Sequence, residues 1–277
     1  MLLTIAHETI YRYAQAAAYS IQVLRLYPRS DGGQRIIAWQ VDSPGRRWQQ
    51  LDACGNRIYV ISRNEPHRET RIVARGQVET ADERGRLVAH GIRVPPLAFA
   101  QPTRLTQSDA AIAALATQTL GGGAGTLRAG LEALTAAIFG SVAYVQGVTE
   151  VNNTAAETLA AGSGVCQDMA HIFVAACRAA GVPARYVSGY ILTDDRHAAS
   201  HAWAEAWIAD ALGGAGAWLG YDVTHNRLAG PESCRLAVGR DYLDAGPVRG
   251  SRIGGLQEEM EVRVVVADSV PGLTQQQ

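Results

Sequence analysis

The hydrophobic periodicity of the chain changes once, near Pro95, Pro96 and Pro102. Before these prolines, segments such as residues 3–13 alternate between apolar and polar residues, as half-buried β-strands do. After them, apolar residues recur about every three and a half positions, which is the spacing of one helix face. This change constrains the fold more than any other feature, because it predicts β structure first and helices afterwards.

Residues 1–97 are therefore predicted to form an N-terminal antiparallel β-sandwich domain. Gly55-Asn56 lies between two strand-like runs and indicates a hairpin. The histidines of this region, His7, His67 and His90, have no partner pattern nearby, so we expect them to be surface or strand residues. The predicted strands cover residues 3–13, 20–27, 35–41, 48–51, 58–61 and 71–79.

Residues 98–277 are predicted to form a second domain, an α+β core with an antiparallel sheet. Ser108 is expected to cap a helix over residues 109–120, and Thr154 to Glu157 forms a capping box before another. Strands then follow one another without the alternating rhythm of βαβ units. The predicted helices cover residues 109–120, 127–139, 154–162 and 166–180, and the strands cover residues 184–192, 201–208, 218–223 and a returning strand at 261–266.

Composition excludes several classes of protein. The 277 residues are 47% hydrophobic and 18% charged, with a net charge of -1. This balance of charges does not indicate nucleic acid or a membrane surface as a partner. No apolar run approaches the ~18 residues of a membrane span, and the first residues lack a leader pattern. We expect a cytoplasmic protein, and the sequence leaves its oligomeric state open.

Four cysteines in a chain of this length do not indicate a disulfide framework, and there is no C-x-x-C pair. His197 and His201 have the helical spacing of a metal pair, but the residues after His201 alternate like a strand. We therefore predict no metal and no cofactor.

Cys166 stands out among the cysteines because a small-residue run leads to it and a helical pattern begins at it. At a helix start, unpaired backbone N–H groups and the helix dipole favour a thiolate, which is a nucleophile. The alternative is a buried cysteine that acts as a small hydrophobe. Asp168 fits a favourable first-turn charge, and His171 lies about 140° around the helix from Cys166, which makes it a poor base.

Two later residues complete an ordered trio with Cys166. His201 opens one predicted strand and Asp222 ends the next, so the carboxylate can orient the imidazole across the sheet and aim its other nitrogen at the thiol. His225 is the rival base. Trp203 and Trp207 share the His201 face of the strand, where they either wall a cleft or pack in the core.

The motifs GVCQDMAH, PARYVSGY, SHAWAEAW and YDVTHN resemble those of the transglutaminase-like superfamily. RLYPR, LDACGN and GRDYLDAGPVRG resemble the bacterial branch that carries an N-terminal β domain. The resemblance covers nearly the whole chain and implies a papain-like core. It implies Cys166 as nucleophile, His201 as base and acid, and Asp222 as the orienting carboxylate. Val223 departs from the proline that is usual after the aspartate, which affects the strand end rather than the carboxylate.

The resemblance further implies acyl transfer through a thioester, with a peptide or protein amide as substrate. The favoured function is hydrolysis by a cysteine protease or amidohydrolase. The alternatives are a transglutaminase that passes the acyl group to an amine, and a non-catalytic binding protein, against which the intact Cys166, His201 and Asp222 argue. The backbone N–H of Cys166 is one candidate oxyanion donor. Gln167 is a weaker one, and no second donor can be assigned from the sequence.

Overall fold

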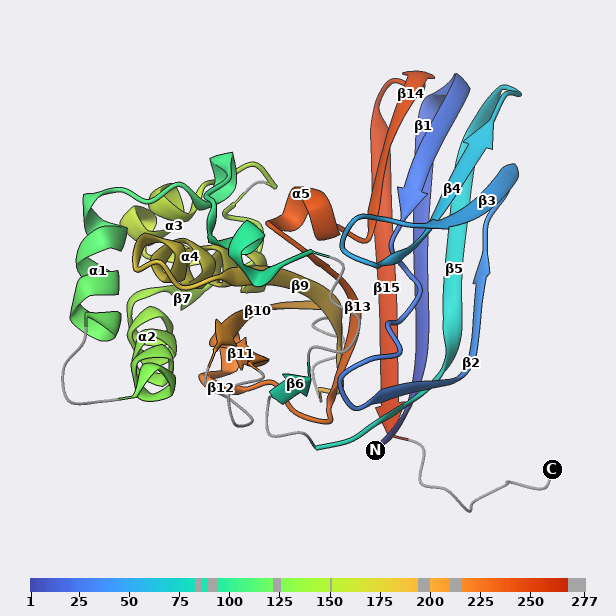
Figure 1. The fold of residues 1–277 in the computed structure, drawn as a ribbon. Helices are drawn as coiled ribbons and strands as arrows, with labels where there is room; N and C mark the ends of the chain where they lie inside the picture. The colour runs from blue at the N-terminus through green and yellow to red at the C-terminus, as the bar shows by residue number, and fades with distance from the viewer. Residues whose placement is uncertain are drawn as a thin grey trace.

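The two ends of the chain meet in one antiparallel sheet, and the middle of the chain forms a helical layer on a second sheet (Figure 1). The computed structural model describes residues 1–82, 86–88, 94–121, 126–149, 151–193, 200–209 and 216–268. The predicted positions His90 and His197, and the glycine-rich stretches at residues 122–125 and 213–215, lie outside these residues.

A single long strand, β1 (Leu2–Leu24), organises the N-terminal sheet. Its first half pairs with β5 and its second half with β4, and the pairing is irregular between Arg12 and Ala17. The sequence predicted two strands here, because the run from Ala14 to Ala18 interrupts the alternation. The sheet order is β2 (Gln34–Asp42), β5 (His67–Thr80), β1, β4 (Arg57–Arg63) and β3 (Arg46–Leu51).

The C-terminal strands complete this sheet. β14 (Val248–Gly254) pairs with the second half of β1, and β15 (Glu258–Asp268) pairs with the first half. Seven strands therefore form one curled sheet, and the predicted two-layered sandwich is not confirmed. The returning strand of the sequence prediction exists, but it joins the N-terminal sheet. The domain boundary after residue 97 stays a prediction.

The second sheet is antiparallel, as predicted. Its central strands, β9 (Ala184–Ile191) and β10 (Ser200–Ile208), pair with each other. The short β6 (Arg86–Val88) pairs with the first residues of β11 (Ala217–Asp222). A further strand, β13 (Ser233–Gly239), was not predicted from the sequence, and all of its residues are buried. The strand order is β12 (Arg227–Leu228), β11 (Ala217–Asp222), β10 (Ser200–Ile208), β9 (Ala184–Ile191) and β13 (Ser233–Gly239), with β6 at Arg86–Val88.

The helices begin and end close to the predicted positions. Asp109, not Ser108, caps α1: its carboxylate accepts the Ile112 N–H at 2.8 Å. The predicted capping box of α3 is confirmed, and Gly162 ends that helix at a φ of 65°. The elements are η1 (Pro96–Ala100), η2 (Arg104–Thr106), α1 (Ala110–Leu120), α2 (Leu127–Ser141), β7 (Ala143–Tyr144), α3 (Ala155–Ala161), β8 (Ser163–Gly164), α4 (Cys166–Ala179), η3 (Val223–His225) and α5 (Tyr242–Ala245).

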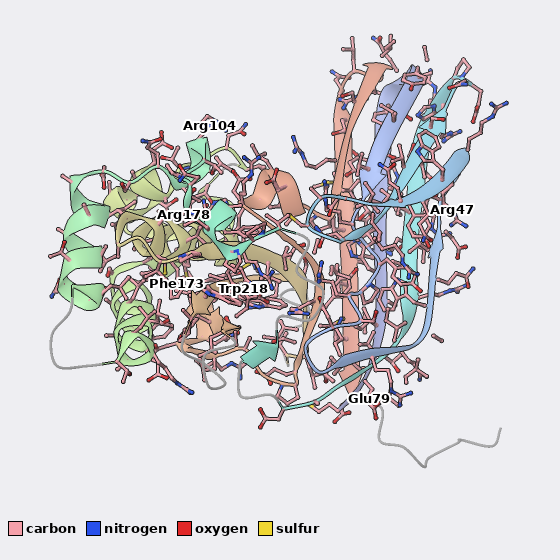
Figure 2. All side chains as sticks on the ribbon, in the orientation of Figure 1. Arg47, Glu79, Arg104, Phe173, Arg178 and Trp218 are labelled. Atoms are coloured by element: carbon pink, nitrogen blue, oxygen red, sulfur yellow. The ribbon has the colours of Figure 1, made fainter. Side chains whose placement is uncertain are left out.

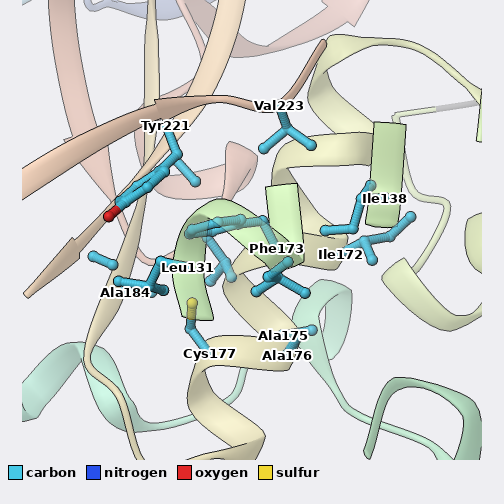
Figure 3. Packing of buried hydrophobic residues seen from close by; sticks show 14 of the residues in the cluster. Leu131, Ile138, Ile172, Phe173, Ala175, Ala176, Cys177, Ala184, Tyr221 and Val223 are labelled. Atoms are coloured by element: carbon cyan, nitrogen blue, oxygen red, sulfur yellow. The ribbon is translucent and has the colours of Figure 1, made fainter. Parts of the chain in front are cut away.

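Helix α4 is the buried centre of the core. Every residue from Asp168 to Arg178 is buried, because the second sheet covers one side and α1, α2 and α3 cover the others. Figure 3 shows Phe173 stacked on Tyr221 of β11, with ring centroids 5.1 Å apart. Truncating such an aromatic ring typically costs about 3–5 kcal/mol. The packing therefore fixes the position of the helix start.

Arg178, in the last turn of α4, is buried and ties the segment before α1 to the core (Figure 2). Its guanidinium donates to the Phe99 carbonyl at 2.8 Å and to the Thr106 hydroxyl at 2.6 Å. It also donates to the carbonyls of Ala184 and Arg240. Burial lowers the pKa of Arg178 to about 10, so the group stays charged at neutral pH.

A buried charge cluster joins the N-terminal sheet to the core. Arg235 of β13 pairs with Asp31 of the β1–β2 loop and with Glu205 of β10. Glu205, which is fully buried, also pairs with Arg185 at 2.5 Å. Arg29 donates to Asp31 at 2.7 Å. Such pairs add little net stability, but a misaligned docking would leave their charges buried and unpaired.

No helix among the residues that the structure describes is both long and apolar enough to cross a membrane.

Asn56 offers a test of the docking between the N-terminal sheet and the core. Its amide pairs with both backbone groups of Val238, at 2.8 and 2.9 Å, and accepts from Arg29 at 2.6 Å. Asn56→Ala leaves these buried partners unsatisfied, so we expect a loss of about 2–4 kcal/mol in the free energy of unfolding. Urea unfolding measures it.

The matched control is Asn64→Ala, which removes the same amide from an exposed position in the connection between β4 and β5. It should change stability by less than about 0.5 kcal/mol. Equal unfolding curves for the two variants would contradict a docking role for Asn56.

Candidate active site

Cys166 is the first residue of α4, as the sequence predicted. Asp168 holds the chain entering the helix, because its Oδ2 accepts the Val165 N–H at 2.9 Å and the Thr149 hydroxyl at 2.7 Å. A Cβ at Gly164 would lie 2.9 Å from this same oxygen, which explains the glycine. Asp168 therefore acts as the structural first-turn carboxylate that was predicted.

His201 and Asp222 are brought together by the adjacent strands β10 and β11. The His201 Nε2 and Asp222 Oδ1 atoms are 2.9 Å apart, and both side chains are almost fully buried. Since Nε2 is committed to the carboxylate, Nδ1 is the nitrogen that remains for the hydrogen bond between His201 and Cys166. The structure thus places the three predicted residues in one chain of hydrogen bonds.

The electrostatics of this trio favour a charged imidazole. Burial alone lowers the pKa of His201, but the hydrogen bonds to Asp222 and Cys166 outweigh burial and raise the pKa to about 10. Burial likewise opposes the charge of Asp222, yet the hydrogen bonds from His201 and His225 hold the pKa of this carboxyl well below its usual range. An imidazolium beside the thiol stabilises a thiolate.

His225, the alternative base in the sequence analysis, contacts Asp222. Its Nδ1 lies 2.7 Å from Asp222 Oδ2, so both oxygens of the carboxylate are occupied, and Arg227 approaches the same oxygen at 3.7 Å. The ligand atoms of His201, Asp222 and His225 lie within 4.8 Å of one another, a spacing that also suits a metal. In this structure the two histidines are already hydrogen-bonded to Asp222, and a metal ion would have to replace the protons of both hydrogen bonds.

The other aromatic and polar candidates have structural contacts. Trp203 stacks on His201 at 6.0 Å but packs in the core with Val187 and Val238. Trp207 packs on Trp218.

His171 is fully buried, and burial lowers its pKa to about 3. Its Nε2 accepts the Tyr242 N–H at 3.1 Å, so this histidine supports α5. Gln167 donates to the Val151 carbonyl at 3.3 Å.

A cavity of about 260 Å³ opens in front of Cys166 and His201. Core residues, among them Gln167 and Tyr186, line one side of it, and β1, β14 and β15 line the other. His7 of β1 is buried in this second wall rather than on the surface, with its ring nitrogens 2.8 Å from the Tyr190 hydroxyl and 2.7 Å from the Thr9 hydroxyl. The sequence carried no signal for this contribution, because strand alternation does not reveal which domain a strand faces.

A cysteine at a helix start that faces a histidine–carboxylate pair on an antiparallel sheet defines a papain-like arrangement. In such a site the thiol can attack a carbonyl carbon, and the histidine can move the proton.

Two family models and several known proteins match the chain. Residues 113–223 match the model of the transglutaminase-like superfamily, and residues 3–79 match that of the bacterial transglutaminase-like N-terminal region. An uncharacterized protein from Mycobacterium tuberculosis is 32% identical over 291 residues, covering 96% of this chain and 92% of the relative. Another from Mycobacterium leprae is 27% identical, covering 95% and 98%. The chain belongs to the transglutaminase-like superfamily.

A solved structure shares the fold along the whole chain. The crystal structure of a protein from Cytophaga hutchinsonii, described as a putative cysteine protease, superposes with a TM-score of 0.74 at 24% identity. It covers 100% of this chain and 94% of that one.

We predict that Cys166 reacts first when the protein meets a limited amount of iodoacetamide near neutral pH. Cys177 and Cys234 are fully buried, and burial raises the pKa of both thiols. Cys54 is partly accessible, but burial, with Asp52 nearby, raises its pKa to about 11. Peptide mass spectrometry after partial alkylation identifies the modified thiol.

His201→Ala serves as the matched variant, because it removes the imidazolium and leaves the access to Cys166 unchanged or wider. Alkylation of Cys166 should become slower in this variant. Faster modification of Cys54 in the wild type would contradict the assignment.

Proposed function

We propose that this protein is a cysteine-dependent acyl-transfer enzyme that hydrolyses peptide or protein amide bonds through a thioester. The observation that carries the proposal is the hydrogen-bonded series from Cys166 through His201 to Asp222, beside a cavity that reaches the thiol. A protein that only binds ligands has no need for a buried imidazole held between a thiol and a carboxylate.

The reaction that this geometry supports has two halves. The Cys166 thiolate attacks the amide carbonyl carbon, the C–N bond breaks, and the departing amine takes the proton from His201 Nδ1. Water then attacks the thioester and gives its proton to the same nitrogen, and the C–S bond breaks to release the acid. Asp222 keeps the ring oriented and stabilises its positive charge throughout. The Cys166 backbone N–H, at the helix start, is the proposed oxyanion donor.

Hydrolysis is favoured over transfer to an amine by the chemistry of the cavity. An amine acceptor such as a lysine side chain arrives as an ammonium ion, which a carboxylate at the entrance would attract. The described residues that line the cavity include no aspartate and no glutamate. Water needs no such attraction.

Products decide between these reactions. A peptide amide incubated with the protein and a fluorescent primary amine should yield the free acid. Mass spectrometry should detect transient acylation of Cys166 during the reaction. A peptide–amine adduct as the main product would indicate a transglutaminase. With neither product and no acylated Cys166, the protein would be a binding protein on this fold.

His201→Ala should lower kcat by about 10²–10⁴-fold, because a general base and acid is typically worth that much. His225→Ala removes only the hydrogen bond to Asp222 Oδ2, so activity should stay within about tenfold of wild type. Steady-state hydrolysis by both variants measures the difference. The reverse ranking would make His225 the base.

Asp222→Asn should retain measurable turnover, because an asparagine can still accept from His201, although its amide can also favour the wrong imidazole tautomer. Asp222→Ala should lose considerably more, since the histidine then has no orienting partner. Turnover is compared for the three proteins, and melting curves separate lost activity from lost fold. Full activity in Asp222→Ala would reduce the site to Cys166 and His201.

A further inference from the structure

The wall of the cavity opposite Cys166 belongs to the N-terminal sheet, and two cross-strand pairs build it. Tyr11 of β1 is paired with Met260 of β15, and Thr9 is paired with Val262. These four side chains share one face of the sheet, because residues two apart on a strand point the same way. All four line the cavity. Figure 1 shows β15 on the side of its sheet nearest the core.

This wall is apolar where it meets solvent. Met260 is 60% exposed and Val262 is 44% exposed, although each lies at the mouth of a cavity that leads to the nucleophile. Val148 and Val151, in the loop that contacts Gln167, are also about half exposed (53% and 49%). Exposed apolar side chains that line a cavity, as Met260 and Val262 do, indicate a surface that binds an apolar partner.

Apart from His201, the described residues that line the cavity include no charged side chain. None of them is an aspartate, glutamate, lysine or arginine. The His7 ring is uncharged at neutral pH, because burial lowers its pKa to about 4, and both of its nitrogens are occupied by Tyr190 and Thr9. His201 is committed to Asp222 and Cys166. A charged substrate group would therefore lose water without meeting, among the described lining residues, an opposite charge that is not already paired.

We propose that Tyr11, Met260 and Val262 determine substrate specificity, and that they select a peptide amide whose side chain next to the scissile bond is apolar and uncharged. This inference rests on the proposed amide hydrolysis. The N-terminal sheet thus supplies the specificity wall of the active site in addition to its structural role. The volume of about 260 Å³ suits one such side chain together with the acyl group.

Matched peptide substrates test the selection in the wild-type protein. Three fluorogenic peptide amides carry Leu, Asp or Lys beside the scissile bond and are otherwise identical. We expect kcat/KM for the Leu peptide to exceed that for each charged peptide by at least about tenfold. The same three sequences, made as electrophilic ketones, should label Cys166 in the same order of rates. This second readout does not depend on turnover.

Val262→Asp tests the wall itself. It should lower kcat/KM for the Leu peptide by about tenfold or more and narrow the gap between the Leu and Lys peptides, because the new carboxylate can pair with the lysine. The control is Val265→Asp, which adds the same charge to the same strand. Val265 is 61% exposed and pairs with Ala6 on the other face, so this variant should keep the wild-type preference.

The outcomes separate the specificity from the activity. If the three peptides are cleaved at equal rates, or the three ketones label Cys166 at equal rates, the proposed specificity of this wall is wrong and the hydrolase proposal stands. Equal effects of Val262→Asp and Val265→Asp on the substrate preference would also contradict the proposed specificity of the wall. If no peptide is cleaved and no ketone labels Cys166, the proposed function fails and the specificity fails with it.

Discussion

The structure depends on the pairing of its first long strand with its last one. Backbone hydrogen bonds join β1 to β15 from Leu3 and Asp268 to Tyr13 and Glu258, and β14 continues the pairing along the second half of β1. The helical core lies between these strands in the sequence, so both of its ends are attached to one sheet. This attachment sets where the N-terminal sheet can lie, and the buried contacts of Asp31 with Arg235 then fix how it is oriented.

This arrangement gives the candidate active site two halves. In the proposed enzyme the core supplies the chemistry, because α4 is buried along almost its whole length and holds Cys166 against His201. The N-terminal sheet supplies the opposite wall, in which the neutral His7 and the apolar Val262 face the cavity. A change that loosens the docking at Asn56 is therefore expected to weaken the proposed substrate selection as well as stability.

Local patterns in the sequence were sufficient for much of the fold and for the ordered trio. The period change near Pro95 separates strands from helices, and the glycine and small residues before Cys166 mark the start of α4. The antiparallel core sheet followed from consecutive strands without βαβ rhythm. These features depend on residues that are neighbours in the chain, so the sequence displays them directly.

The tertiary structure alone decided which strands pair and what faces Cys166. Alternation identifies β15 as a strand, but its partner β1 lies more than two hundred residues away and leaves no local signal. β13 is buried on both faces, so it lacks the alternation that would have predicted it. His225 lies three residues from Asp222 in sequence, yet only the turn at η3 aims it at the second carboxylate oxygen. By itself the sequence determined the order of Cys166, His201 and Asp222 along the chain. The packing of distant strands decided which wall these residues face, because strand pairing is set by backbone groups that every residue shares.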